Sequence, residues 1–404
     1  MDGGVADGGD SGSGFACPPV TAQGTCSPPA DIRCPYPKLS QTGCVNPNNP
    51  LQLAAVVIPY EVNSPLWSDG AVKTRGMRIP TGAKIHVKDC VANPNECCVL
   101  DPTTLSSCLK PYDDGKWVFP VGTVMVKNFM FPDASQASGY KFFETRLFIH
   151  VSDQTGPDGG VQSSNWIGYG YQWNDAQSEA TVTSDYVYDA ESTATFQTTG
   201  ADGGAQSIVW HYPSRAECLQ CHTATTPTGG YTLGPETIQM NRVVAGDTIN
   251  QIDKLAGMGL FDAPPSKPYL AALVAPYPGQ AGSPPAGASL DVRARSYLHA
   301  NCSFCHRPDG TFTSMDLRFA TPLSATGTCG AMPGKGDQGV AGALILSPGQ
   351  SASSVLWLRM NAPASTTPTD DTGRMPPIAS FVVDTQATTL ISDWIDSITS
   401  CPAM

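Results

Sequence analysis

The stretch Asn301–Pro308 reads NCSFCHRP, and the earlier stretch Cys218–His222 reads CLQCH, so the pattern C-x-x-C-H occurs twice in 404 residues. In this pattern the two thiols add across the vinyl groups of one haem, and the His that follows ligates the iron. At this content of Cys and His, roughly one hundredth of such a motif is expected by chance. The sequence therefore predicts two covalently bound haem c groups.

The predicted haem-binding residues follow directly from the motif. The thiols are Cys218, Cys221, Cys302 and Cys305, and the iron ligands are His222 and His306. Zinc held by four thiolates would give no reason for a His after each second Cys. A thioredoxin-like pair needs a βαβ context around one motif, and structural disulfides are awkward at this spacing.

The composition indicates a globular, loop-rich chain of two or three domains. Apolar residues make up 41% and charged residues 14%, with 40 Gly and 36 Pro. The net charge of −12 and the pI near 4.8 argue against nucleic acid as a partner. We expect redox protein partners, a donor and an acceptor, that present basic faces.

Cysteine usage predicts an oxidising compartment. Of the 14 Cys, four are assigned to haem, and ten remain. Eight of these precede residue 110, an even number that favours disulfides, although 105 pairings are open. They are Cys17, Cys26, Cys34, Cys44, Cys90, Cys97, Cys98 and Cys108. We expect a periplasmic or surface-anchored protein.

No apolar run reaches the 18 residues that cross a bilayer, and Leu51–Ile58 comes closest. The start Met1–Gly4 lacks the basic and apolar parts of a signal peptide, so we expect the numbering to begin after a removed export signal. Residues 1–37 are rich in Gly, Asp, Ser and Pro. They are typical of a flexible tether behind a lipid anchor that lies outside the numbered chain, and an ordinary frayed terminus is an equal alternative.

Residues 38–206 predict a mostly β domain with a sandwich architecture. In Phe142–Ile149, one face carries Phe143, Leu147 and Ile149, as expected for a sheet strand. The Cys-rich segment Cys90–Cys108 predicts a disulfide-braced loop.

Two features of this domain have two interpretations each. The segment Trp67–Gly70 either lines a site or forms a turn beside a core tryptophan. The pair Glu144 and Arg146 either lines a site or forms a cross-strand ion pair.

Residues 207–285 form the predicted first haem segment and a connector rich in Pro, Ala and Gly. An apolar stripe in Thr248–Leu260 has helical spacing and would cover one haem face. The alternative candidates for the sixth ligand of this iron are Met240, Met258 and His211. With none of them bound, the first iron would be five-coordinate and could meet small molecules.

Residues 286–404 form the predicted second haem domain. Ser289 can cap a helix that runs directly into Cys302. His299 faces elsewhere on that helix, which favours a hydrogen-bonded residue at the surface or between the haems over an iron ligand. Thr389–Ser397 carries a second apolar helical stripe. Cys329 and Cys401 remain for a disulfide.

This order of features resembles class I cytochromes c. In that class an entry helix precedes C-x-x-C-H, a Met before prolines supplies the sixth ligand, and a terminal helix crosses the first. The resemblance implies that His306 is the proximal ligand and that Met375, in Arg374–Pro377, is the distal one. Met360 is the competing candidate, and helix packing suits it better.

From about Leu39 onward the chain resembles a family of exported bacterial dihaem c-type cytochromes with an N-terminal β domain. The matching stretches are Asn63–Gly70, Phe119–Thr123, Pro213–Cys218 and Arg293–Leu298. The resemblance implies haem binding and this order of domains.

Three functions fit the sequence. The first is electron transfer between exported redox partners through two haems. The second is a dihaem enzyme of peroxidase or oxidase type, in which the first iron is open and the second feeds it electrons. The third is a β-domain binding module whose haems sense redox state.

Overall fold

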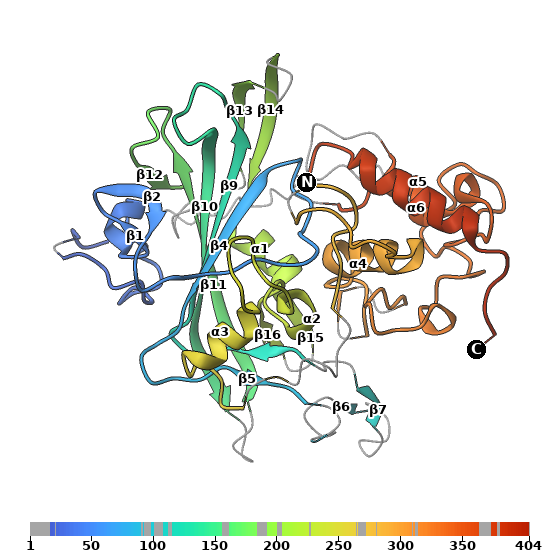
Figure 1. Ribbon diagram of the computed structural model, residues 1–404, viewed down its shortest axis with the longest axis horizontal. Helices are drawn as coiled ribbons and strands as arrows, with labels where there is room; N and C mark the ends of the chain where they lie inside the picture. Colours follow the sequence, from blue (N-terminus) through green and yellow to red (C-terminus); the bar gives the residue numbers. More distant parts are fainter. Residues whose placement is uncertain are drawn as a thin grey trace, which may run out of the picture.

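A large sheet crosses the middle of the molecule, and a helical lobe stands beside it (Figure 1). The computed structural model describes residues 17–403 except 21, 90–91, 93–97, 101–107, 112–114, 156–160, 184–191, 200–203, 226–227, 264, 266–271, 280, 309, 312–313, 363–372 and 378–379. No helix in these ranges is long and apolar enough to cross a membrane.

The large sheet has eight strands, in the order β15-β16-β11-β10-β9-β4-β3, with β12 paired to β11. Its neighbours are antiparallel except for β11 and β16, which are parallel. The strands are β3 (Ile58–Pro59), β4 (Val72–Arg78), β9 (Val124–Pro132), β10 (Tyr140–Thr155), β11 (Val161–Trp173), β12 (Ala180–Val182), β15 (Thr223–Thr225) and β16 (Thr228–Gly230).

Among the described residues, four two-stranded ribbons lie around this sheet. They pair β1 (Val45–Asn46) with β2 (Asn49–Leu53), β5 (His86–Val87) with β8 (Trp117–Val118), β6 (Cys98–Leu100) with β7 (Cys108–Pro111), and β13 (Ser192–Thr199) with β14 (Ala205–Tyr212).

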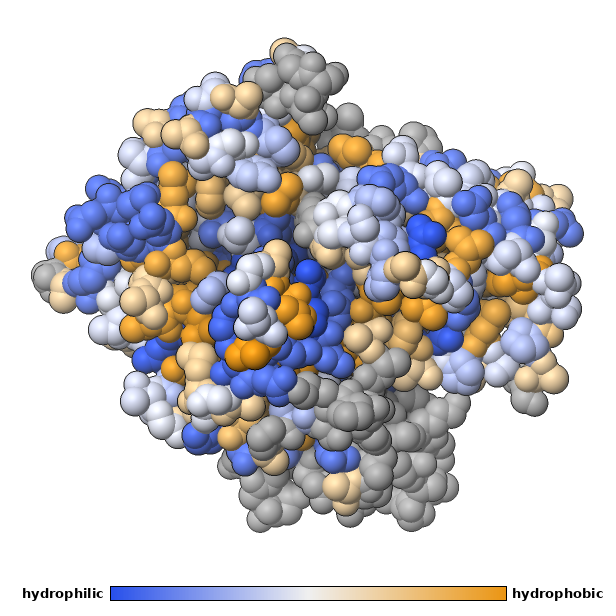
Figure 2. Space-filling model, viewed as in Figure 1, coloured by the Kyte–Doolittle hydropathy of each residue, from blue (hydrophilic) through white to orange (hydrophobic). Residues whose placement is uncertain are grey.

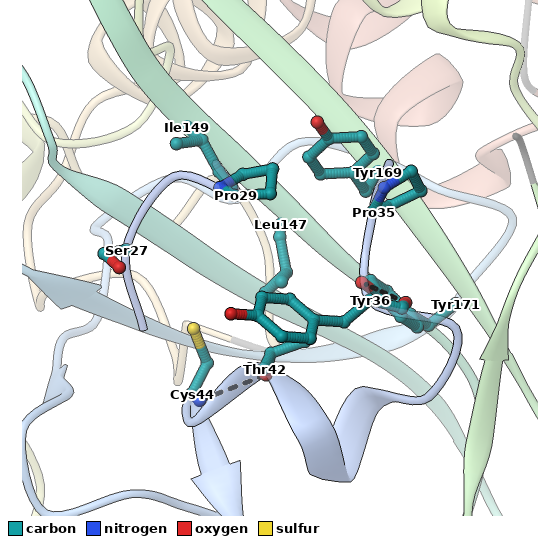
Figure 3. A pocket seen from close by; sticks show the side chains of 10 residues that line it. All are labelled: Ser27, Pro29, Pro35, Tyr36, Thr42, Cys44, Leu147, Ile149, Tyr169 and Tyr171. Atoms are coloured by element: carbon teal, nitrogen blue, oxygen red, sulfur yellow. Dashed lines mark hydrogen bonds between the residues drawn. The ribbon is translucent and has the colours of Figure 1, made fainter. Parts of the chain in front are cut away.

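One face of the sheet is covered by the N-terminal segment. Val126, Leu147 and Tyr169 pack there against η1 (Leu39–Thr42) and against Cys26 and Cys44, which form a disulfide. A small pocket lies in this contact (Figure 3). Its tyrosine hydroxyls donate to backbone carbonyls, Tyr169 to Ile32 and Tyr171 to Tyr36. This pocket lies on the face opposite Gly168, which the first haem motif contacts.

The mostly β N-terminal domain is confirmed, but the predicted sandwich is wrong. One large sheet carries the β13–β14 ribbon on its second face, in place of two comparable sheets. The predicted face of Phe142–Ile149 is also wrong in part. A register shift between Phe142 and Glu144 turns Phe143 toward the β13–β14 ribbon, whereas Leu147 and Ile149 face the N-terminal segment.

The predicted first haem segment, residues 207–285, is built onto the β domain. Its strands β15 and β16 join the large sheet, and its helices are α1 (Arg215–His222), α2 (Thr237–Met240) and α3 (Gln251–Gly257). Of the predicted stripe, Ile252 and Leu255 pack on the sheet with Met125 and Phe148. Ile249 precedes α3 and is exposed, because Asn250 caps the helix after it.

The helical lobe contains α4 (Leu290–Cys302), α5 (Val355–Met360) and α6 (Thr385–Ser397), with the short η4 (Leu323–Ala325) and η5 (Ser351–Ser353). The side chain of Ser289 accepts from the Val292 amide, so the predicted cap of α4 is confirmed. The predicted stripe of α6 is buried against α4. α6 begins before Thr389, because Asp384 caps it.

Three disulfides are described. Cys329–Cys401 is the predicted pair, and Cys17–Cys34 and Cys26–Cys44 join the early cysteines. Cys90 and Cys97 lie outside the described residues, and with them the predicted bracing of the loop.

Candidate functional site

The two C-x-x-C-H motifs lie next to each other, although they are far apart in the sequence. The Cys305 thiol lies 3.9 Å from the carbonyl oxygen of Gln220, 85 positions away. The thiols of Cys221 and Cys305 also share a hydrogen bond, which raises the pKa of Cys221 and lowers that of Cys305. α1 and α4 face each other across a hydrophilic hollow between the lobes (Figures 1 and 2).

The first motif is placed by a short, well-capped helix. The Ser214 hydroxyl accepts from the Glu217 amide, and the Glu217 carboxylate accepts from the Ser214 amide, so both ends of a capping box are made. The helix lies against β11 at Gly168. A Cβ atom there would stand 2.9 Å from the Cys218 sulfur, so only Gly leaves this thiol its place.

His222 is held in a form that can ligate a metal. Burial lowers its pKa to about 4, so the imidazole is neutral at pH 7. Its Nδ1 lies 2.9 Å from the carbonyl oxygen of Tyr231, which fixes the proton on Nδ1 and leaves the Nε2 lone pair for a metal. Its ring packs on Phe148, with 4.4 Å between the ring centroids.

Tyr231 joins the two motifs. Its carbonyl accepts from His222 of the first motif, and its hydroxyl donates to the carbonyl of Phe304, inside the second motif, at 3.2 Å. Lys116 and Arg307 lie over its ring at 5.3 and 4.7 Å from the centroid. Sequence reasoning missed this residue, because no local pattern marks a tyrosine that spans two distant segments.

The second motif begins at the last residue of α4, and its two cysteines and its histidine are half-buried. Burial, followed by the charge of Arg359, lowers the pKa of His306 to about 4. The backbone of Arg359 accepts from the Met375 amide at 3.0 Å, so one residue links His306 to the predicted sixth ligand. Met360 instead packs in the core between α4 and α6, as its competing interpretation holds.

The three residues predicted as candidate sixth ligands have different surroundings. Met240 is fully buried, and its sulfur lies 3.7 Å from the side-chain amide of Gln251. Met258 is 56% exposed at the end of α3. His211 is buried, and both carboxylate oxygens of Glu217 lie 3.1 Å from its Nε2.

His299 joins the first haem segment to α4. It is buried and not on the surface, so that part of its prediction is wrong. Its Nδ1 accepts from the Phe319 amide, so Nε2 carries the proton and donates to Glu236 at 2.6 Å. Lys116 contacts the other oxygen of Glu236 at 3.5 Å. Burial alone would raise the pKa of Glu236, but Lys116 and His299 lower it to about 2.

The segment Trp67–Gly70 forms a turn, as one of its interpretations holds, but Trp67 beside it is only half-buried and not in the core. The turn joins the two lobes. The Asp69 carboxylate accepts from the amides of Phe381 and Val382 and from the Ser380 hydroxyl, at 2.7–3.0 Å. The Trp67 indole donates to the Val382 carbonyl. These contacts hold the chain that follows Met375.

Glu144 and Arg146 form an ion pair within β10, not across strands. Arg146 donates from Nε and Nη2 to the two carboxylate oxygens at 2.7 and 2.8 Å. The Trp210 indole donates to the same carboxylate, which is fully buried.

Arg374, next to Met375, carries orphaned donors. Its side chain is buried, and Nη2 donates to Ser380 and to the Val382 carbonyl. Its Nε and Nη1 are buried without a hydrogen-bond partner among the described residues. Such donors suit an anionic group such as a haem propionate.

The residues present fit two haem groups. The fit rests on the neutral, oriented imidazole of His222, the space that Gly168 leaves for Cys218, and the orphaned donors of Arg374. In the part of the chain that the structure describes, no three His, Cys, Asp or Glu side chains converge as a metal cage. A haem iron takes four ligands from its porphyrin, so such a cage is not needed.

Comparison with protein-family models, with curated proteins and with solved structures finds no match for this chain.

Proposed function

We propose that this chain is an exported dihaem c-type cytochrome that transfers electrons between redox partners. Cys218 and Cys221 would hold one haem with His222 as ligand. Cys302 and Cys305 would hold the other, with His306 and Met375 as ligands. The observation that carries the proposal is the approach of the two motifs, with the Cys305 sulfur 3.9 Å from the Gln220 carbonyl oxygen, because haems bonded at neighbouring motifs would lie close enough to exchange electrons.

Bound haem would supply a one-electron couple at each motif, and the protein's own residues would tune and connect the two. Met and His ligation raises the reduction potential of a haem, so Met375 would favour the reduced form of the second haem. Tyr231 would connect His222 to Phe304 through two hydrogen bonds. The three disulfides support assembly outside the reducing cytosol. The net charge of −12 favours partners with a basic face.

Haem content tests this proposal. The protein expressed with haem-attachment machinery should keep two haems through acid-acetone extraction, as measured by pyridine haemochrome and by intact mass. Cys218→Ala with Cys221→Ala should keep one, and Cys302→Ala with Cys305→Ala the other. Loss of all colour on extraction of the unmodified protein would refute the proposal.

Spectra of the oxidised protein distinguish an electron-transfer protein from a peroxidase-type enzyme. Two low-spin EPR signals are expected for electron transfer. A high-spin signal together with peroxide turnover would assign the first iron to a peroxidase-type reaction instead.

Tyr231→Phe is expected to slow electron exchange between the haems several-fold without changing either potential. The substitution removes the hydroxyl that donates to Phe304 and keeps the carbonyl that orients His222. Flash reduction followed at two wavelengths measures the rate. Tyr140→Phe, at the far end of β10, is the matched control. An unchanged rate would remove Tyr231 from the path.

A further inference from the structure

Four aromatic rings form a continuous stack that begins at His222. The centroid of the His222 ring lies 4.4 Å from that of Phe148 on β10, and Phe148 lies 5.0 Å from Trp166 on β11 at an interplanar angle of 18°. The Trp166 ring then lies 4.6 Å from the ring of His150 at an angle of 7°. These separations are those of interacting aromatic pairs. Among the ring contacts of the described residues, only this stack reaches a histidine of either motif.

The pairing of β10 and β11 builds the stack. Trp166 stands directly opposite His150, and Phe148 stands opposite Gly168, so these positions share one face of the sheet. Gly168 has no side chain, and the Cys218 sulfur lies in the space that a Cβ atom there would need. Phe148, Trp166 and His150 are all buried. The rings therefore lead, out of contact with water, from the first motif along the two strands.

The far end of the stack is a hydrogen-bonded pair that reaches solvent. The Nδ1 of His150 donates to the carbonyl of Phe119 at 2.9 Å, and its Nε2 lies 2.7 Å from Oδ1 of Asp153. The Ser164 hydroxyl donates to the same oxygen at 2.6 Å. The Asp153 side chain is 24% exposed. The stack thus meets the surface at this carboxylate.

This pair can compensate a positive charge on the indole. The proton between Nε2 of His150 and the carboxylate oxygen of Asp153 can move from the nitrogen to the oxygen along one hydrogen bond, without any heavy atom moving. The imidazole that faces Trp166 then loses a positive charge. Charges interact strongly in a buried site, so this shift favours loss of an electron from the indole beside it. Indole, with phenol, is the protein side-chain group that gives up one electron most readily.

We propose that Trp166 is a redox-active residue through which electrons pass from the first haem to a strong one-electron oxidant at the surface beside Asp153. The inference rests on the proposed function and adds an exit for electrons on the β domain. Electron tunnelling slows exponentially with distance, so two short steps through an indole are faster than one long step past it.

The electrons and protons of the exit balance. Trp166 gives one electron to the oxidant, whose potential must be close to that of an indole, and the proton on Nε2 of His150 shifts to Asp153. The indole cation then accepts one electron from the reduced haem, and the proton returns to His150. The sum is one electron from haem to oxidant with no proton gained or lost.

The experiment is flash oxidation of the haem-loaded, reduced protein from a ruthenium label at Gln154→Cys. Gln154 is exposed and adjoins Asp153. Peptide mass confirms a single label at this position, and a laser flash with a soluble quencher leaves ruthenium(III) there. We expect a short-lived absorption of the indole cation, and oxidation of the first haem faster by about an order of magnitude than in Trp166→Phe. Phenylalanine keeps an aromatic ring in the stack but loses an electron far less readily.

Trp173→Phe is the matched control. Trp173 is also a buried tryptophan of β11, but it packs on the opposite face of the sheet, against the N-terminal segment. Its replacement should leave the rate and the indole signal unchanged. Asp153→Asn removes the group that takes the His150 proton and should diminish both, and this partly exposed site carries the test if Trp166→Phe fails to load haem.

Equal oxidation rates with and without Trp166, and no indole signal, would overturn the inference and leave the stack as core packing. The haem content and the first-haem potential of Trp166→Phe should match those of the unmodified protein, so that a changed rate reports the path and not the driving force. Pyridine haemochrome keeps the two proposals apart. Absence of haem from the unmodified protein overturns the proposed function, whereas two haems with equal rates overturn this inference alone.

Discussion

Asp69→Asn is expected to loosen the chain after Met375 from the β domain and to cost about 1–3 kcal/mol of stability, because hydrogen bonds to a charged acceptor are replaced by weaker ones to a neutral amide. The carboxylate is 6% exposed and accepts from two backbone amides and a hydroxyl. All three donors reach Oδ1, and the Phe381 amide also reaches Oδ2, so an amide in its place keeps a neutral acceptor for them but turns its N–H₂ group toward the Phe381 amide. The backbone itself is not at issue: Asp69 has φ 50°, and Asn tolerates that conformation as well as Asp does.

The expected consequence for the second haem is loss or weakening of Met375 ligation. The charge-transfer absorption between Met and ferric iron should diminish, and the second potential should fall, because Met ligation raises it. Thermal unfolding and the ferric spectrum measure the two effects. Asp175→Asn, at an exposed ion pair, should change neither. A variant with wild-type melting and spectrum would show that the clamp does not hold the ligand.

Glu236→Gln is expected to cost about 3 kcal/mol at neutral pH. Lys116 and His299 stabilise the buried carboxylate, and the gap between its ordinary pKa of 4.5 and about 2 corresponds to that free energy. Because the folded pKa lies below the unfolded one, this stability is present above pH 4.5. It is lost as the pH falls through about 2.

Urea unfolding at pH 6 and at pH 3 measures this contribution. The difference between wild type and Glu236→Gln should be large at pH 6 and smaller at pH 3. Asp247→Asn removes one partner of the exposed pair with Lys254 and should cost below about 1 kcal/mol. Equal stability of wild type and Glu236→Gln at pH 6 would mean that the junction of first haem segment and α4 is held by other contacts.

Local patterns predicted local structure well. Ser289 caps α4, the stripe of Leu390, Ile391 and Trp394 is buried in α6, and Cys329 pairs with Cys401. Each of these rests on residues close in sequence or on a cysteine left without another use. The face of Phe143 was mispredicted because the alternation of side chains breaks at a register shift, which no composition rule marks.

The position of Lys127 in the sequence is unusual for a charged residue. It interrupts an apolar run on a strand whose other residues are mostly buried. Its two cationic neighbours could not be predicted, because only the folded sheet places Arg75 of β4 and Arg146 of β10 beside it. Tyr231 gave no comparable signal.

By itself the sequence determined the chemistry expected at each motif, because two thiols and a His at fixed spacing are a property of five consecutive residues. It also determined the capped helices and strands that carry them. Only the tertiary structure decided that the two motifs meet at Cys221 and Cys305, that a turn of the β domain clamps the second lobe, and that cations from three strands line up. Contacts between distant segments depend on how the whole chain packs, and no local pattern records that packing.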